Sequence, residues 1–204
     1  HDRHGNGFRQ GFRALVVYTP AVPEELGEMQ FVREAGYNIL KRSQILGEIT
    51  AGQKCLAVAG THGKTTTSTL IAHILTDSGE GCSAFLGGIS RNYGTNMLMS
   101  HTPVAVAEAD EFDRSFLRLH PAIAVITAMD ADHLDIYGDL GHVQEAYRQF
   151  ASQVSDVLIH KYGLPLSKDV TGAKMYTYGV GEPRADFHAV NLRPGSDGHY
   201  TFDL

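Results

Sequence analysis

The sequence predicts an α/β protein with a mostly parallel sheet that carries helices on both faces. Three observations support this fold class. Short apolar runs alternate with segments of helical periodicity, an order typical of a parallel sheet. A glycine-rich loop joins one of these runs to a helix-like segment. The stretch 172–204 has short alternations and more Tyr, Gly and Asp, which predicts small antiparallel strands near the C-terminal end.

The composition is that of a globular protein. Of the 204 residues, 43% are hydrophobic and 20% are charged, which argues against disorder and coiled coil. No apolar run is long enough to span a membrane, and the N-terminus lacks the apolar core of a secretory signal. A net charge of -6 gives no basic field for nucleic acid. Cys55 and Cys82 are the only cysteines, so we expect a reducing, cytoplasmic location.

The elements follow in order along the chain. Residues 1–12 show no period, and we expect a frayed end there. The run 14–18 predicts a buried strand, and Pro23 with the acids after it predicts a helix start. A further strand–helix pattern runs through 36–49. The later pattern predicts strands at 55–59, 84–86, 104–107, 122–127 and 157–159, and helices from the glycine-rich loop to Gly79 and at 143–154.

The strongest chemical signal is GTHGKTTT between a strand and a helix. Glycines let backbone N–H groups curl around phosphate oxygens, and the helix N-terminus adds partial positive charge. Lys64 is placed to supply a full charge to the β and γ phosphates, and Thr65 a hydroxyl to Mg²⁺. The common phosphate loop would have a glycine at Val58, whereas this chain has the shorter G-x-x-G-K-T from Gly60. The alternative is a plain glycine turn with an exposed lysine.

Acidic residues follow two later strand candidates. Glu108 to Glu111 reads EADE directly after one apolar run, and Glu108, nearest the strand end, is our choice for a magnesium ligand. The alternative is a solvated acidic loop. After the next run, His133 either binds a metal or plays a structural role, and Asp132 and Asp135 either cap a helix or take part in chemistry. The glycine-bounded loop 87–96 either approaches a substrate or is a surface loop.

These motifs carry a resemblance to a family. GTHGKTTT, EADEFDRSFL and DADHLDIYGD, in this order and spacing, resemble the Mur ligases of peptidoglycan synthesis. Within the family they are most similar to the members that join L-alanine to UDP-N-acetylmuramate. VVYTPAVP and YNILKRSQILGEI resemble the end of the family's N-terminal domain and its linker. The resemblance covers 13–160 well and the rest loosely.

The resemblance implies a domain organisation. The family has a Rossmann-like domain that binds the UDP-sugar, a central domain that binds ATP, and a third domain that binds the incoming amino acid. By this resemblance, residues 1–50 are the tail of the first domain with the linker, and 51–204 are an incomplete central domain. The C-terminal ligase domain is expected to be absent, so we expect this fragment alone to be inactive.

The resemblance also implies a reaction and its residues. ATP phosphorylates the lactyl carboxylate of UDP-N-acetylmuramate, and the amino group of L-alanine attacks the acyl phosphate. Thr65 and Glu108 would share one Mg²⁺, and His133 would help Glu108 hold a second. The Asn that usually follows Thr127 in the family is Ala128 here. The expected catalytic residues are Lys64, Glu108 and His133; those that bind the nucleotide are Gly60, Thr61, His62, Gly63, Lys64, Thr65 and Thr66; those that bind metal are Thr65, Glu108 and His133.

Other functions stay open on sequence grounds. A ligase that recycles murein peptides shares the motifs, although FLRLHPAIAVIT and DHLDIYGD are more like the alanine-adding members. A P-loop kinase or nucleotidase would end with phosphate transfer, but the chain shows no Arg-rich lid pattern. A folded but inactive nucleotide-binding module is compatible with the ligase interpretation.

Overall fold

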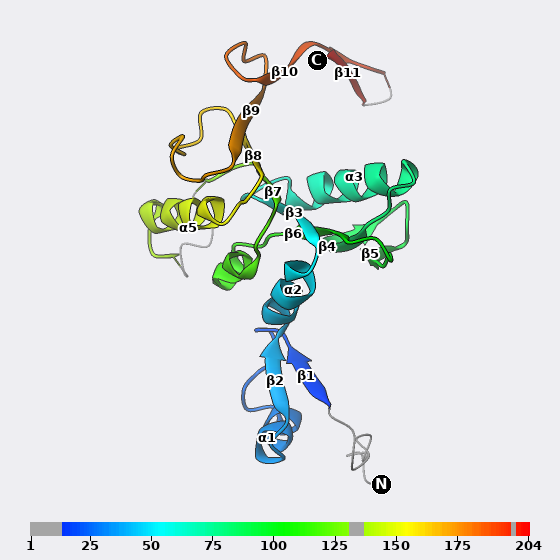
Figure 1. Ribbon diagram of the computed structural model, residues 1–204, viewed down its shortest axis with the longest axis vertical. Coiled ribbons are helices and arrows are strands. Elements are labelled where there is room, and N and C mark those ends of the chain that lie inside the picture. The colour runs from blue at the N-terminus through cyan, green and yellow to red at the C-terminus, as the bar shows by residue number, and fades with distance from the viewer. Residues whose placement is uncertain (1–13, 131–136, 197–198) are drawn as a thin grey trace.

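The computed structural model describes residues 14–130, 137–196 and 199–204. They form a two-stranded sheet and a nine-stranded sheet, separated along the length of the molecule (Figure 1). The small sheet pairs β1 (Leu15–Tyr18) in parallel with β2 (Asn38–Lys41).

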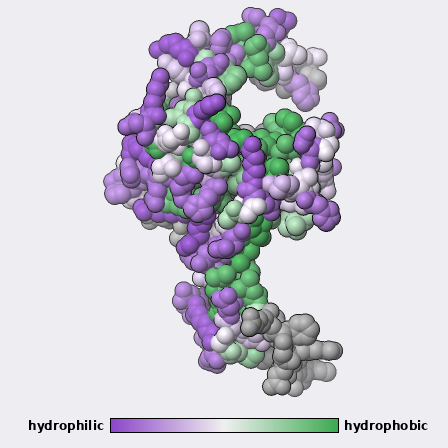
Figure 2. Space-filling model, viewed as in Figure 1, coloured by the Kyte–Doolittle hydropathy of each residue, from purple (hydrophilic) through white to green (hydrophobic). Residues whose placement is uncertain are grey.

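Two helices belong to the N-terminal part. Helix α1 (Gly27–Glu34) lies between β1 and β2, and α2 (Arg42–Ala51) leads from β2 to the large sheet (Figure 1). We expected the first helix to open at Pro23, but it begins four residues later, because Leu26 has an extended backbone that separates the helix from the turn in which the Pro23 carbonyl accepts a hydrogen bond from Leu26 N. Apolar surface is visible over the narrow region of α2, β1 and β2 (Figure 2). No described helix has the length and apolar character needed to cross a membrane.

The large sheet is mostly parallel, as predicted. Its order is β11-β10-β9-β8-β7-β3-β6-β4-β5, and only the edge pairs β4–β5 and β10–β11 are antiparallel. The strands are β3 (Lys54–Ala59), β4 (Ser83–Ser90), β5 (Thr95–Leu98), β6 (Val104–Glu108), β7 (Ile123–Ile126), β8 (Val157–Lys161), β9 (Lys174–Val180), β10 (Phe187–Pro194) and β11 (Tyr200–Asp203).

The two edges refine the sequence prediction. The antiparallel C-terminal strands are confirmed for β10 and β11, whereas β9 continues the parallel sheet beside β8. At the other edge, the predicted strand 84–86 continues through its two glycines to Ser90 and turns back into β5. The loop expected at 87–96 is therefore largely a hairpin.

Helices cover both faces of the sheet, as predicted. Side chains alternate between faces along a strand, so β3 divides its residues between two cores. On one face α3 (Lys64–Asp77) packs over β3, β4 and β6. On the other, the 3-10 helix η1 (Phe112–Arg118) and α5 (Leu140–Ser152) pack together, and Phe116 stacks on Phe150 at 5.1 Å between ring centroids.

The strand order places three loops together. Strands β6, β3 and β7 are adjacent and parallel, so their carboxyl ends lie at one edge of the sheet. The phosphate-type loop follows β3, the acidic run follows β6, and Thr127 follows β7. Ligands of open parallel sheets bind at such an edge.

Candidate functional site

The glycine-rich loop is a tight turn from β3 into α3. Gly63 has φ 81°, in the left-handed region, and precedes the first helical residue, Lys64. Gly60 has φ 134°, and a Cβ at Gly60 would overlap the side chain of Thr127 and the backbone N of Ala128. Both positions therefore require glycine. Gly63 needs it for the left-handed backbone conformation, and Gly60 needs it both for its positive φ and for the close approach of the residues that follow β7.

Lys64 is held at the base of this loop. Its Nζ donates to the Gly60 carbonyl at 2.9 Å and to the two carboxylate oxygens of Glu111 at 2.9 and 2.8 Å. The Glu111 side chain is 1% exposed and that of Lys64 is 14% exposed. The lysine expected to meet phosphates thus has a buried carboxylate as its partner in this structure.

Thr65 and Glu108 lie against each other, although they are 43 residues apart in the chain. Thr65 Oγ1 donates to Glu108 Oε1 at 3.0 Å, and the Gly87 backbone N–H donates to Glu108 Oε2 at 2.8 Å. A Cβ on Gly87 would overlap the Glu108 carboxylate. Strand β6 supplies the acid, α3 the hydroxyl and β4 the glycine, so three elements fix this pair.

The outer part of the loop is tied to the end of β7. Thr127 Oγ1 donates to the carbonyls of Ala59 and His62, and Thr61 Oγ1 donates to Asp130 Oδ2 at 3.4 Å. His62 Nε2 lies 3.8 Å from the same Asp130 oxygen, with both side chains mostly exposed. These contacts hold the loop while leaving the helix N-terminus open, where Thr66 is exposed.

A third group of predicted residues cannot be placed. His133, Asp132 and Asp135 lie outside the described residues. Within the described ranges, no three His, Cys, Asp or Glu side chains gather as a metal site. Burial raises the pKa of Cys55 to about 11, so its thiol stays protonated and is a poor metal ligand.

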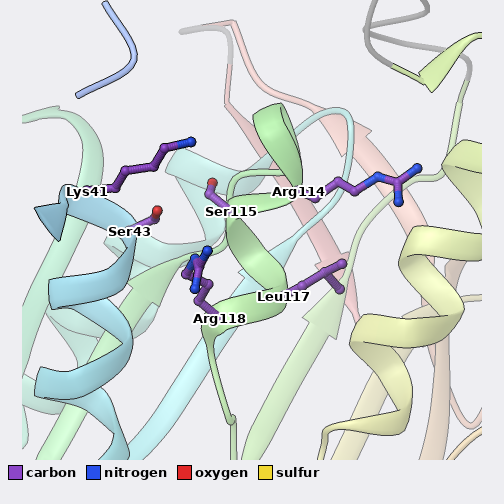
Figure 3. Close-up of a pocket in the computed structure, with 6 residues that line it drawn as sticks. All are labelled: Lys41, Ser43, Arg114, Ser115, Leu117 and Arg118. Carbon is purple, nitrogen blue, oxygen red and sulfur yellow. The ribbon is translucent and has the colours of Figure 1, made fainter. Parts of the chain in front are cut away.

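A separate cleft of about 310 Å³ lies between α2 and η1. Figure 3 shows the polar ends of Lys41, Ser43 and Ser115 near a common space, while Arg114 points away from it. Arg114 instead lies over the Tyr137 ring, 5.5 Å from its centroid. The six residues that line this cleft include no acidic side chain; they are Lys41, Ser43, Arg114, Ser115, Leu117 and Arg118.

Comparison with known proteins decides the family. The model of the Mur ligase middle domain matches residues 58–203. The chain belongs to the Mur ligase family.

Several Mur ligases are similar over nearly the whole chain. UDP-N-acetylmuramate–L-alanine ligase of Phocaeicola vulgatus is 52% identical over 97% of this chain and 43% of the relative. The same enzyme of Parabacteroides distasonis is 48% identical over 98% of this chain and 44% of the relative. The chain thus spans less than half the length of these relatives.

Solved Mur ligase structures have the same fold. UDP-N-acetylmuramate-alanine ligase from Thermotoga maritima has a TM-score of 0.76 at 26% identity, over 88% of this chain and 41% of that one. The UDP-N-acetylmuramate:L-alanyl-gamma-D-glutamyl-meso-diaminopimelate ligase from Neisseria meningitides also has a TM-score of 0.76, at 24% identity, over 92% of this chain and 64% of that one.

The sequence did not single out four residues that shape this Mur ligase site. Glu111 is the last acid of EADE, and nothing in the local pattern distinguishes it from Asp110. Gly87 lies in a glycine loop whose role the sequence leaves open. On sequence alone, Thr127 is a strand end before the missing family Asn, and Asp130 is only the first residue of DADHLDIYGD. A signal did exist for Gly87, since a glycine within a strand often marks a close approach of another group.

Proposed function

We propose that this chain is the ATP-binding part of a Mur ligase that joins L-alanine to UDP-N-acetylmuramate through an acyl-phosphate intermediate. The single observation that supports ATP binding is the pairing of Thr65 with Glu108 beside the Lys64 amine. The names of the similar full-length ligases support the choice of sugar and amino acid. Residues 1–50 would then be the end of the N-terminal domain with its linker, and 51–204 a central domain.

The loop would bind the phosphates through backbone N–H groups and one cation. The first helical hydrogen bond of α3 runs from Thr67 N to the Gly63 carbonyl. The N–H groups of Lys64, Thr65 and Thr66 precede that bond, so they have no acceptor within the helix and can donate to phosphate oxygens. Gly60, Thr61 and His62 complete the loop around them. The Lys64 ammonium would contact the β and γ phosphates.

The oxygen donors of the site fit Mg²⁺. This ion prefers hard oxygen ligands, and it is usually held by one or two carboxylates together with substrate phosphates and water. The Thr65 hydroxyl and the Glu108 carboxylate supply two such oxygens 3.0 Å apart. When bound, the ion would offset charge on the phosphates. We propose His133 as a ligand for a second ion beside Glu108.

The proposed reaction has two steps, a phosphoryl transfer and then an acyl transfer. A carboxylate oxygen of UDP-N-acetylmuramate forms a bond to the γ phosphorus while the bond to the β–γ bridging oxygen breaks, and ADP leaves. The amine of L-alanine then attacks the acyl carbon, loses a proton, and inorganic phosphate departs. Anions meet in the first step, so Lys64 would stabilise charge that both reactants bring. Positioning the amine would require the remaining part of the protein.

An ADP-release assay on the full-length protein tests this function. We expect ADP release with UDP-N-acetylmuramate and L-alanine together, and at most slow release with glycine or L-serine in its place. Faster turnover with an L-alanyl-γ-D-glutamyl-diaminopimelate tripeptide would favour a recycling ligase. Equal ADP release without any amino acid would contradict the ligase and favour a kinase or nucleotidase.

The proposed substrates also suggest a compartment. ATP and nucleotide sugars are cytoplasmic metabolites, and Cys55 and Cys82 are both buried free thiols. Free thiols are typical of a reducing compartment. We propose a cytoplasmic location.

A further inference from the structure

We propose that Glu111 is a positioning residue that holds the Lys64 ammonium in place to receive the β and γ phosphates. This inference rests on the proposed nucleotide site at the glycine-rich loop. It assigns a role to a carboxylate distinct from Glu108.

The contact between the Lys64 and Glu111 side chains is direct and bidentate. Both carboxylate oxygens of Glu111 lie within 2.9 Å of Lys64 Nζ, and the Gly60 carbonyl is a third acceptor at 2.9 Å. An ammonium has three N–H donors, and the two oxygens of one carboxylate can share one of them, so these contacts fix the Lys64 position within the loop and leave an N–H for a phosphate oxygen. A free lysine side chain samples many rotamers, and ordering it costs free energy when a ligand must do so.

The backbone of Glu111 is itself fixed. Its carbonyl accepts from the Tyr137 hydroxyl at 2.6 Å and from the Arg114 backbone N at 3.0 Å, at the start of η1. The side chain points into the core, where Glu111 is 1% exposed. Burial and the nearby Glu111 carboxylate both raise the pKa of Tyr147, so that neighbour stays neutral. Among the described residues, Glu111 forms an ion pair with Lys64.

Glu111 is unsuited to the metal role given to Glu108. Its two oxygens face the lysine, whereas Glu108 faces the Thr65 hydroxyl at the exposed side of the loop. The first and last residues of the acidic run therefore have different roles. Glu108 faces the side where the ligand would bind, and Glu111 holds the Lys64 ammonium from the buried side.

A buried carboxylate also has a structural role, which the test must separate from positioning. Removing one partner of a buried ion pair is destabilising because the other charge stays buried without compensation. Loss of stability alone would therefore support neither role. Dependence on the number of phosphates is specific to positioning, because Lys64 contacts the phosphates and not the nucleoside.

The test measures the affinities of ATP, ADP and AMP, with Mg²⁺, for full-length Glu111→Gln by competition with a fluorescent ATP analogue. The glutamine amide keeps the shape and one acceptor but loses the charge. We expect ATP and ADP to bind about tenfold more weakly, as one freed lysine side chain would cause, and AMP to bind as in wild type. Glu111→Asp should show a smaller loss. Glu80→Gln makes the same change at an exposed position and should match wild type.

A double-variant cycle shows whether Glu111 acts through the lysine. In the Lys64→Met background, Glu111→Gln should weaken ATP binding by less than twofold, since the group it positions is gone. That double variant should also melt at a higher temperature than Lys64→Met, because an unpaired buried charge is removed.

Three outcomes would overturn the proposal: unchanged ATP and ADP affinity in Glu111→Gln, an equal loss for AMP, or an undiminished loss in the Lys64→Met background. A different failure would concern the proposed function itself. If wild type bound ATP no more tightly than AMP, the loop would not be a phosphate site, whatever Glu111 does.

Discussion

At the residue scale, the placement of the site carboxylate depends on a glycine. Gly87 donates its backbone N–H to Glu108, and a Cβ at this position would lie within 2.6 Å of three carboxylate atoms. Real Cβ atoms do not approach so closely, so any larger residue must push Glu108 away from Thr65. Strand β4 thus contributes a glycine whose missing side chain leaves room for the Glu108 carboxylate.

Gly87→Ala should therefore reduce the proposed ligase activity of the full-length protein without unfolding it. Misplacing a reacting group by about 1 Å can cost on the order of a hundredfold in rate, so we expect ADP release to fall by tenfold or more. Gly172→Ala is a matched control, because a Cβ there meets nothing within 4 Å. Activity of Gly87→Ala within twofold of wild type would show that Glu108 is not needed in its present position.

The sequence predicted the kinds of residue at the site better than their pairings. Lys64, Thr65 and Glu108 were chosen from the loop motif and from the end of an apolar run, and the structure brings all three to one edge of the sheet. The Lys64–Glu111 pair could not be predicted, because two neighbouring acids offer the same charge. Which one turns inward depends on how η1 begins, and the local pattern does not specify that.

At the element scale, α2 packs closely on η1 at one glycine. A Cβ at Gly47 would lie 2.7 Å from the backbone carbonyl oxygen of Arg118. That carbonyl belongs to η1, the element that follows Glu111. The close packing of these helices therefore supports the region that carries the acidic run.

Gly47→Ala should destabilise the protein. Alanine normally stabilises a helix by about 0.5–1 kcal/mol relative to glycine, but here the added methyl meets backbone that cannot rotate away. Overpacking of this kind costs about 1–3 kcal/mol, so the net change should be unfavourable. Urea unfolding would measure it, with Gly27→Ala in α1 as the open control. A higher urea midpoint for Gly47→Ala would disprove the close contact.

Element types were more predictable than their edges. The buried parallel strands are continuous apolar runs, and that pattern located β3, β6, β7 and β8 to within two residues at each end. The β4–β5 hairpin was missed because its glycines favour a loop when the chain is considered alone. Of these glycines, Gly87 leaves the space that the Glu108 carboxylate of the neighbouring β6 occupies.

At the scale of the whole molecule, strand order creates the site. The central strands follow the order β7-β3-β6, so loops distant in sequence meet at one edge. No local pattern specifies that order, since each apolar run could pair with several others. The resemblance to the Mur ligases implied the fold class but not the order of the strands, and the family match over residues 58–203 with the similar solved structures now supports that fold.

The central claim is that Thr65 and Glu108 share a magnesium ion that accompanies ATP. Calorimetric titration of full-length wild type and Glu108→Gln with ATP, with and without Mg²⁺, tests it most directly. We predict that Mg²⁺ tightens ATP binding about tenfold or more in wild type, as an added carboxylate ligand would allow, and that Glu108→Gln loses most of this gain. A full Mg²⁺ dependence in Glu108→Gln would contradict the claim.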